Sequence, residues 1–578
     1  MTEQSKNSHL GIIIQGSLSA GLEMRLDASQ SVEDLRVGRF VVVEGANTRF
    51  FSMVTDVTLS SSNPNILFNP PGTDPFLMAV LSGTSTFGTV KLQPMLMLEK
   101  QALAAFSLGS AATLSEEENE GRGLRPVKTI PSHFSQVFEA SAEDFALVFG
   151  KEDNTPGNTY FSIGRPLNME VPVCVNLNRF IERSNGIFGK SGTGKSFLNR
   201  IFLSGIISKD LASVLVFDMH NEYGWQAMSE SKSAPRVKGL KQLFGHQVVV
   251  FSLDAESSKA RGIPDARELY IGYNQIEIED LDLLKNELAL SEATLENAYI
   301  AREKLGQDWI ATLLDMSGEE IEEFTQVHKG HPVALKTLQR RLNTIVQKTP
   351  YLRPRVNHNY IEEILQQIQA GKHIVLEFGR QNNLLSYMLA TNIITRRIHA
   401  EYVRQSERYI CDPERVNPPR KLVIVIEEAH KFLSPQVARQ TIFGIIAREM
   451  RKYFVTLLIV DQRPSGIDPE ILSQIGTRVT ALLNDDKDID AVFTGVSGSQ
   501  TLRTVLSQMD PKQQALVLGY AVPMPVVVRT RAFDSEFYKA VAPDGEAHDW
   551  RKLARGSREE RQILEERAQN AAGELFGD

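Results

Sequence analysis

The pattern of apolar and polar positions divides the chain near residue 187. Before it, short β-rich runs at 10–14, 39–43 and 90–98 alternate with turn-rich stretches, a pattern typical of a small β-barrel. After it, short apolar runs alternate with longer segments of helical spacing, which predicts βαβ units and a buried, mainly parallel sheet. The predicted strands lie at 214–217, 248–251, 374–378, 422–426, 455–460 and 479–483.

Other stretches predict an inserted subdomain and connecting loops. The second and third predicted strands are separated by roughly 120 residues, more than one crossover requires, and much of this segment is charged with helical spacing, as at 276–307. We therefore expect a helical insertion. Residues 60–75, 115–123 and the proline-rich 413–419 are predicted loops. A capping-box pattern at Ser557 predicts a terminal helix.

Composition limits the classes of protein to consider. Of 578 residues, 42% are hydrophobic and 23% are charged, as in ordinary globular proteins. The 63 Lys and Arg and 71 Asp and Glu give a net charge of -8, so any nucleic-acid binding would be local. Cys174 and Cys411 are too few for a disulfide framework or a zinc site, which favours a reducing cytoplasm. The apolar stretches are short or broken by proline, so neither a signal peptide nor a membrane span is expected.

A phosphate-binding loop is predicted between the apolar run 186–188 and a helical segment. Residues 189–196 match G-x-x-x-x-G-K-S. The glycines let backbone N–H groups surround phosphates, Lys195 can reach the β and γ oxygens, and the Ser196 hydroxyl can ligate Mg²⁺. A chance glycine-rich turn is the alternative, but the flanking strand and helix favour an ATP site. The predicted nucleotide-binding residues are Gly189, Lys190, Ser191, Gly192, Thr193, Gly194, Lys195 and Ser196.

Two acidic residues follow a predicted buried strand. The run 422–426 ends at Glu427 and Glu428, at the strand end where ligands bind in parallel sheets. Nucleotide hydrolysis needs an acid near the metal and a group that orients the attacking water. We assign Glu427 to the Mg²⁺ shell and Glu428 to polarising water. Two solvated acids at a strand end are the alternative.

Polar residues after two further strands are weaker candidates. Gln462 follows the strand at 455–460, and its amide both donates and accepts hydrogen bonds, which suits a sensor of the γ-phosphate. An ordinary loop glutamine is the alternative. Asp218 and Glu222 follow the strand at 214–217, and they either line the same edge of the sheet or have a structural role.

Four segments together resemble a known family. They are the loop GKSGTGKS, FDMHNEYG, EEAHKFL and REMRKYFVTLLIVDQRPSGIDPEILSQIGTRV. In combination they are similar to the HerA subgroup of the FtsK/HerA ATPases, and the similarity extends weakly to the N-terminal region, where this family carries a HAS barrel. The resemblance implies a homohexameric ring that hydrolyses ATP and moves double-stranded DNA through its pore, usually with a nuclease partner. Glu427 stands where many relatives have Asp, and either carboxylate suits Mg²⁺.

In such a ring a neighbouring subunit lends a cation to the ATP site, and several arginines are candidates. Arg183 precedes the phosphate loop at a place where family members often carry an Arg thought to reach the adjacent subunit. Arg448 and Arg451 follow Glu428, and Arg463 is next to Gln462. We favour Arg183, then Arg451, as the catalytic residue supplied by a neighbour. A surface salt bridge is the alternative for each.

The sequence specifies DNA contacts poorly. Lys232, Arg236, Lys238 and Lys241 form either a pore loop that tracks the DNA backbone or a solvated basic face. Arginines at 551–567 alternate with glutamates, a pattern that suits contacts with a neighbouring subunit better than DNA.

The predicted fold class is α/β: a RecA-like P-loop ATPase core with an N-terminal β-barrel, a helical insertion and a C-terminal helical extension. The expected domains are a HAS-like barrel with its linker at 1–165, the first part of the core at 166–254, the insertion at 255–372, the second part of the core at 373–535, and the extension at 536–578.

The predicted function is ATP-driven translocation of double-stranded DNA, together with a NurA-like nuclease in DNA repair or a nuclease or sirtuin-like effector in antiviral defence. One alternative is a nucleotide-regulated ring scaffold that assembles and activates such an effector. A substrate-directed P-loop kinase lacks an acceptor-site motif. A secretion or conjugation pump of the same superfamily fits less well because no membrane segment is predicted. No nuclease metal cluster is evident in the sequence, so cleavage would belong to a partner.

Overall fold

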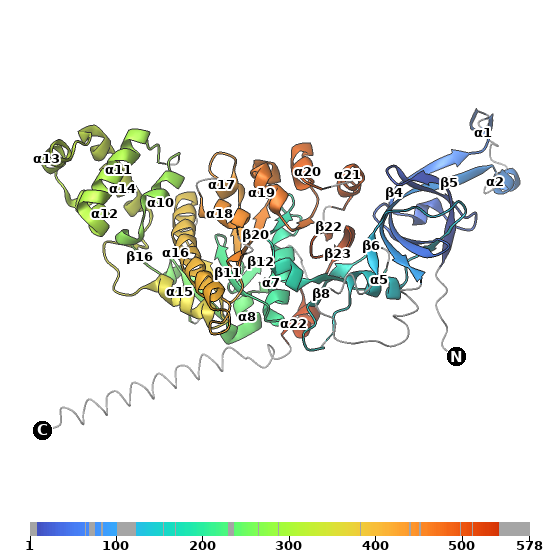
Figure 1. The fold of residues 1–578 in the computed structure, drawn as a ribbon, viewed down its shortest axis with the longest axis horizontal. Coiled ribbons are helices and arrows are strands. Elements are labelled where there is room, and N and C mark those ends of the chain that lie inside the picture. Colours follow the sequence, from blue (N-terminus) through green and yellow to red (C-terminus); the bar gives the residue numbers. More distant parts are fainter. Residues whose placement is uncertain are drawn as a thin grey trace, which may run out of the picture.

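The computed structural model has a barrel at one end, a large sheet in the middle and a group of helices at the other end (Figure 1). It describes residues 8–63, 65–68, 75–81, 85–100, 123–153, 155–167, 169–228, 236–263, 265–286, 288–381, 383–438, 441–449, 452–496, 499–510 and 513–542. Arg451, Lys232, most of the predicted loop at 115–123 and the predicted terminal helix lie outside these residues. No helix among them is both long and apolar enough to cross a membrane.

Six antiparallel strands close into the predicted N-terminal barrel. Their order is β2-β1-β7-β3-β4-β5, closed by pairing of β5 with β2, while β6 (Leu124–Pro126) adds to the free side of β5. Alternating apolar side chains such as Leu22, Met24 and Val90 fill the interior. The barrel strands are β1 (His9–Ser17), β2 (Gly21–Leu26), β3 (Phe40–Glu44), β4 (Thr48–Ser61), β5 (Thr86–Glu99) and β7 (Gln136–Glu139).

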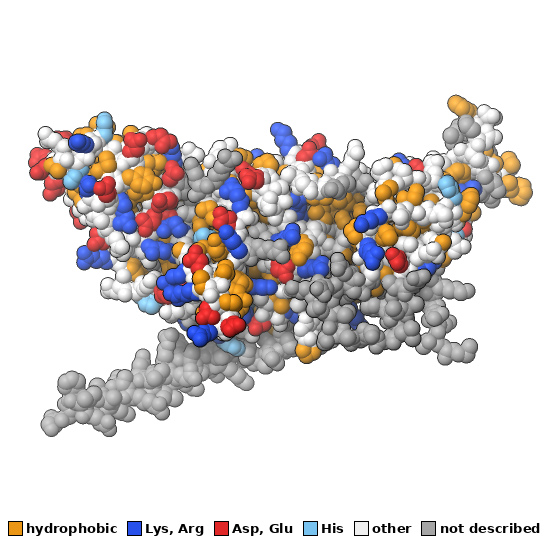
Figure 2. Space-filling model, in the orientation of Figure 1, with side chains coloured by type: hydrophobic (Ala, Val, Ile, Leu, Met, Phe, Trp, Pro, Cys, Tyr) orange, Lys and Arg blue, Asp and Glu red, His pale blue; other side chains and the backbone are white. Residues whose placement is uncertain are grey.

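The hairpin of β4 and β5 projects from the barrel and carries α1 (Asn65–Phe68) and α2 (Pro75–Leu81) near its tip (Figure 1). The sequence analysis predicted a loop at 60–75. The structure instead continues β4 to Ser61 and forms α1 within that stretch. Apolar side chains gather at this tip, and Phe68 and Phe76 are exposed (Figure 2).

The central sheet confirms the predicted α/β core. Seven adjacent strands run parallel in the order β14-β18-β11-β19-β20-β10-β21. They are β10 (Asn185–Phe188), β11 (Ser213–Asp218), β14 (Val248–Ser252), β18 (His373–Glu377), β19 (Leu422–Glu427), β20 (Val455–Asp461) and β21 (Thr477–Thr480). The last predicted strand, 479–483, instead spans Thr477–Thr480; beyond it the Ala481 N–H donates to the Phe188 carbonyl at 2.8 Å and the Leu482 carbonyl accepts from the Lys190 N–H at 3.0 Å.

Both faces of this sheet are buried. Leu215 and Phe217 pack in the same cluster as α16 (Leu384–Cys411), whereas Val214 and Val216 pack in the cluster that contains α7 (Lys195–Ser208). Because side chains alternate along a strand, the two clusters lie on opposite faces. This double burial explains why the strands appear in the sequence as continuous apolar runs rather than alternating ones.

Four antiparallel strands extend the sheet beyond β21. They are β22 (Gln514–Gly519), β23 (Val526–Thr530), β8 (Tyr160–Arg165) and β9 (Val173–Asn176). β8 and β9 pair with each other although they lie on either side of the expected domain boundary at residue 165. The barrel meets this region through α5 (Ala142–Phe149), where Phe145 and Phe149 pack against Phe40.

The segment between β14 and β18 is mainly helical. Within it, α11 packs against α12 and α14 around the buried Trp309, and α15 returns to the sheet beside β18. The helices are α9 (Ala255–Ala260), α10 (Ile278–Leu283), α11 (Glu292–Leu305), α12 (Trp309–Asp315), α13 (Gly318–His328), α14 (Pro332–Lys348) and α15 (Tyr360–Gln369). At the start of the segment, β15 (Arg267–Glu268) adds a short parallel strand to the β14 edge of the central sheet, and β16 (Ile271–Gly272) pairs in parallel with β17 (Leu352–Arg353).

The remaining elements lie mostly on the core. They are α6 (Leu177–Ile181), β12 (Gln226–Met228), β13 (Arg236–Lys238), α8 (Leu240–Phe244), α17 (His430–Leu433), α18 (Ile442–Glu449), α19 (Pro469–Gln474), α20 (Asp486–Val492), α21 (Ser499–Ser507) and α22 (Ser535–Val541).

Candidate nucleotide-binding site

The phosphate-loop sequence forms the turn between β10 and α7. Gly192 and Gly194 have φ angles of 78° and 93°, which side chains of L-residues rarely adopt. Thr193 fastens the turn by donating its hydroxyl to the carbonyl of Lys190 at 2.7 Å. The turn therefore runs directly into the N-terminus of α7, and the backbone N–H groups at this place favour binding of an anion.

Lys195 begins α7 and reaches back into this loop. Its ammonium donates to the Lys190 carbonyl, with Nζ 3.1 Å from the oxygen. Burial lowers the pKa of Lys195, and the charges of Glu428, Asp461 and Glu427 oppose that effect. The side chain thus lies between the phosphate loop and a group of carboxylates.

Four carboxylates stand at the ends of four adjacent parallel strands. Glu377 ends β18, Asp218 ends β11, Glu427 ends β19 and Asp461 ends β20. The next strand is β10, which leads into the phosphate loop. All four acids therefore lie at the edge of the sheet where ligands bind in open α/β proteins.

Glu427 is almost wholly buried, with 7% of its surface exposed. Its Oε1 accepts a hydrogen bond from the Tyr223 hydroxyl at 2.8 Å, whereas its Oε2 has no partner within the described part of the chain. Burial, with the nearby charge of Asp218, raises the pKa of Glu427 to about 8. A buried carboxylate oxygen that lacks a donor fits a place in the hydration shell of a nucleotide-bound cation.

Glu428 is turned by the backbone toward the next strand. Its φ is 49°, an uncommon value for a residue with a side chain. The amide of Gln462 donates to its carboxylate, with Nε2 3.1 Å from Oε1. Nδ1 of His430 is 3.7 Å from the other oxygen of Glu428. The structure thus brings two of the predicted catalytic residues, Glu428 and Gln462, into direct contact.

Asp461 and His430 are site residues that the sequence analysis did not single out. The Asp461 carboxylate accepts from the backbone N–H groups of His430, at 2.7 Å, and Arg463, at 2.6 Å. Its Oδ2 also lies 3.0 Å from Nδ1 of His430. Asp461 therefore joins the segments that carry Glu428 and Gln462. The sequence feature that could have indicated Asp461 is its position at a strand end, directly before Gln462.

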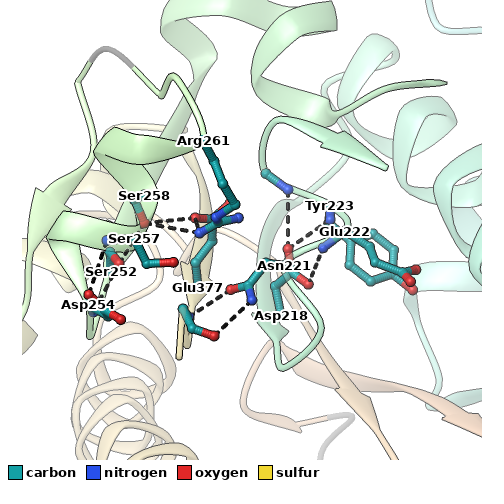
Figure 3. A network of polar contacts seen from close by, with 12 residues as sticks. Asp218, Asn221, Glu222, Tyr223, Ser252, Asp254, Ser257, Ser258, Arg261 and Glu377 are labelled. Atoms are coloured by element: carbon teal, nitrogen blue, oxygen red, sulfur yellow. Dashed lines mark hydrogen bonds and ion pairs between the residues drawn. The ribbon is translucent and has the colours of Figure 1, made fainter. Parts of the chain in front are cut away.

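Asp218 has the structural role that the sequence left open. Its carboxylate accepts backbone N–H bonds from Glu222, Tyr223 and Gly224 at 2.8, 2.7 and 3.2 Å (Figure 3). These bonds hold the loop after β11. Glu222 lines the cleft, and its carbonyl accepts from the buried Arg200 at 2.8 Å.

The cleft around the phosphate loop has a volume of about 1370 Å³. Residues 191–196, Glu427, Glu428 and Gln462 line one part of it. Another part is formed by the end of β23 and the start of α22, including Arg529, Arg531 and Phe533. Arg531 is held by Glu152 and by the Ser162 carbonyl, both at 3.1 Å. No motif marks this second wall in the sequence.

Arg183 lies away from the cleft of its own subunit. It precedes β10, whereas the phosphate loop follows β10, and its side chain is exposed. Its guanidinium stacks over the Tyr520 ring at 4.2 Å. Arg448 on α18 is 3.9 Å from Glu470, and Arg463 is exposed. Of the candidate arginines that the structure describes, Arg183 and Arg463 therefore have exposed side chains.

Two lysines of the basic cluster after β11, Lys238 and Lys241, contact other parts of the protein. Lys241 donates to the Val248 carbonyl at 2.9 Å and to Asp265 at 2.8 Å. Lys238 lies over the Tyr538 ring at 5.4 Å. These contacts favour structural roles for both lysines over DNA contacts.

Comparison with known proteins follows the same division of the chain. Residues 161–398 match the family described as Helicase HerA, central domain, and residues 10–73 match the HAS barrel domain. The DNA double-strand break repair helicase HerA of Pyrococcus furiosus is 22% identical over 72% of this chain and 76% of its own. The protein of the same name from Saccharolobus solfataricus is 24% identical over 87% of this chain and 89% of its own.

Solved structures are more distantly similar. VirB4 of Thermoanaerobacter pseudethanolicus has a TM-score of 0.42 and 13% identity, over 67% of this chain and 100% of that one. The HerA central domain covers the phosphate loop, and the HAS barrel match falls on the strands of the N-terminal barrel. The chain therefore carries a HerA central domain and a HAS barrel domain, and it is an ATP-hydrolysing P-loop enzyme similar to the HerA helicases.

Proposed function

We propose that this HerA-like ATPase uses ATP hydrolysis to move double-stranded DNA through a homohexameric ring. The observation that carries the proposal is the convergence of the phosphate loop, Glu427 and the Glu428–Gln462 pair at one edge of the sheet. Relatives of similar length that are named as repair helicases support a DNA substrate. In this proposal ATP is hydrolysed at the sheet edge, and the ring carries the DNA that hydrolysis moves.

The phosphate loop would bind ATP through its backbone N–H groups and Lys195. To reach the phosphates, Lys195 must leave the Lys190 carbonyl, and it then exchanges a neutral acceptor for a charged one, which strengthens the hydrogen bond. Ser196 and Glu427 would hold Mg²⁺. The ion would neutralise charge on the β- and γ-phosphate oxygens.

Glu428 would orient and polarise the attacking water, and Gln462 would sense the γ-phosphate. The amide of Gln462 already bonds to Glu428, so the arrival of a phosphate acceptor near that amide would change the position of the carboxylate. Asp461 and His430 keep the two segments together. Together these four residues would connect the presence of the γ-phosphate to the position of the Glu428 carboxylate.

Arg183 would act on the nucleotide of a neighbouring subunit. It lies at the amino end of β10, on the order of 13 Å along the strand from its own phosphate loop. Its exposure and its support on Tyr520 suit an interface position. Arg451, which lies outside the described residues, remains the second candidate.

We also propose that the ring works with a nuclease in processing DNA ends. The names of the relatives, which refer to double-strand break repair, support the repair role, and the nuclease follows from the family resemblance. A nuclease or NAD-consuming effector in antiviral defence is the other partner class that the family resemblance suggested, and isolating the ring with its bound protein would distinguish the two.

Steady-state ATPase activity with and without linear duplex DNA tests the proposal. Over a salt series, the DNA-dependent part should fall as salt rises, because phosphate contacts release counterions. Mass in solution should correspond to six subunits, and Lys195→Ala should lose the activity. Turnover that ignores DNA at every salt concentration would contradict a DNA motor and favour the scaffold function.

A further inference from the structure

The Tyr223 hydroxyl connects the phosphate-loop helix with the carboxylate of Glu427. It donates to Oε1 of Glu427 at 2.8 Å and accepts from the side-chain amide of Asn199 at 3.0 Å. Asn199 lies on α7, one turn after Lys195. Tyr223 is fully buried, and burial together with the charge of Glu427 holds its pKa well above the usual range, so the hydroxyl remains a donor.

The two oxygens of Glu427 have different surroundings. Oε1 is held by Tyr223, while Oε2 is buried and has no hydrogen-bond partner within the described residues. Glutamate has one more rotatable bond than aspartate, so it needs a further contact to keep one direction. Fixing Oε1 leaves Oε2 as the oxygen that still lacks a donor, on a residue that lines the cleft.

The loop that carries Tyr223 is braced against movement (Figure 3). Asp218 accepts its backbone N–H groups, and Asn221 exchanges two hydrogen bonds with the backbone of Gly379, at 2.8 and 3.0 Å. Gly224 packs so closely on Glu377 that a Cβ there would lie 2.3 Å from Oε1. The hydroxyl of Tyr223 is therefore presented from a rigid support.

We propose that Tyr223 is a positioning residue that aims Oε2 of Glu427 at the hydration shell of the nucleotide-bound cation. The inference rests on the proposed place of Glu427 in that shell. Groups that orient a ligand residue in this way commonly affect metal affinity by about 10- to 100-fold. Tyr223 would act through Glu427 and would not touch the nucleotide.

Tyr387 supplies a matched control. It is also fully buried, and its hydroxyl also bonds to Glu427, but to the backbone: it donates to the carbonyl at 3.0 Å and accepts from the N–H at 3.1 Å. Tyr223→Phe and Tyr387→Phe each remove one buried hydroxyl beside the same residue. Only the first removes a contact to the carboxylate.

The test is calorimetric binding of ADP with and without Mg²⁺, using the full chain and checking each variant by thermal melting. The ratio of the ADP affinity with Mg²⁺ to the ADP affinity without it reports how much the cation contributes to binding. We expect Tyr223→Phe to lower this ratio about tenfold while leaving the Mg²⁺-free affinity unchanged, and Tyr387→Phe to leave the ratio unchanged. In a Glu427→Ala background, Tyr223→Phe should have no further effect.

The outcomes separate the two claims. If Glu427→Ala lowers the ratio and Tyr223→Phe does not, the positioning role is overturned while the assignment of Glu427 stands. If Glu427→Ala leaves the ratio unchanged, the proposed place of Glu427 in the cation shell fails. If Tyr223→Phe does not fold, Asn199→Ala removes the bond on the other side of the hydroxyl. It should lower the ratio in the same direction, and an unchanged ratio there would also overturn the inference.

Discussion

Gln462 donates its side-chain amide to Glu428, with Nε2 3.1 Å from Oε1, and so links the ends of two neighbouring strands, β19 and β20. The positive φ of Glu428 directs its carboxylate toward this contact. An amide that holds this carboxylate can also bond a phosphate oxygen, so under our proposal it connects the nucleotide directly with the group that orients water.

If Glu428 orients the attacking water as we propose, Gln462→Ala should reduce kcat by about tenfold to hundredfold with a smaller change in KM, because the lost contact holds that carboxylate. Gln462→Glu should reduce kcat further, since it places a second negative charge beside Glu428. Steady-state ATPase kinetics check both. An unchanged kcat in Gln462→Ala would rule out the sensor role.

Arg183→Ala should retain ATP binding but lower turnover, on the order of 10³-fold if this arginine neutralises transition-state charge. Mixing it with Lys195→Ala subunits should restore part of the activity, because an intact phosphate loop then meets an intact arginine across an interface. Arg179→Ala is the control, since Arg179 faces the same Tyr520 ring at 5.5 Å. No recovery in the mixture would place Arg183 outside the neighbouring site.

The core and the phosphate site could be predicted because their signals are local. Doubly buried strands appear as apolar runs, and the phosphate loop needs its glycines and Lys195 at fixed spacing. Tyr223 could not be predicted, because its partner Glu427 is 204 residues away and only the sheet order brings them together. The same holds for Arg531, which reaches the cleft through pairing of β23 with β8.

Glu377 should make stability depend on pH. Burial, and then the charge of Asp218, raise its pKa from 4.5 to about 7, so the folded protein keeps a proton that the unfolded chain loses. Its contribution to the free energy of unfolding is therefore complete below pH 4.5 and is lost as pH rises through about 7. Between these two pH values the contribution of Glu377 to the free energy of unfolding changes by on the order of 3 kcal/mol.

Glu377→Gln, which stays neutral, removes this dependence. The melting temperature of the wild-type protein relative to Glu377→Gln should fall between pH 5 and pH 8. Melting curves measured in one buffer series check this. A difference that stays constant with pH, or that increases, would show that Glu377 is ionised throughout and held by Arg261, 2.5 Å from its Oε2.

Displacement of a triplex-forming strand from linear duplex DNA measures translocation most directly. With ATP and Mg²⁺, the wild-type ring should release the third strand at a rate that depends on ATP. Glu428→Gln should bind nucleotide and DNA but release no third strand, because it lacks the carboxylate that we propose polarises water. Release by Glu428→Gln at the wild-type rate, or no release by a wild-type ring that hydrolyses ATP, would contradict a motor driven by this site.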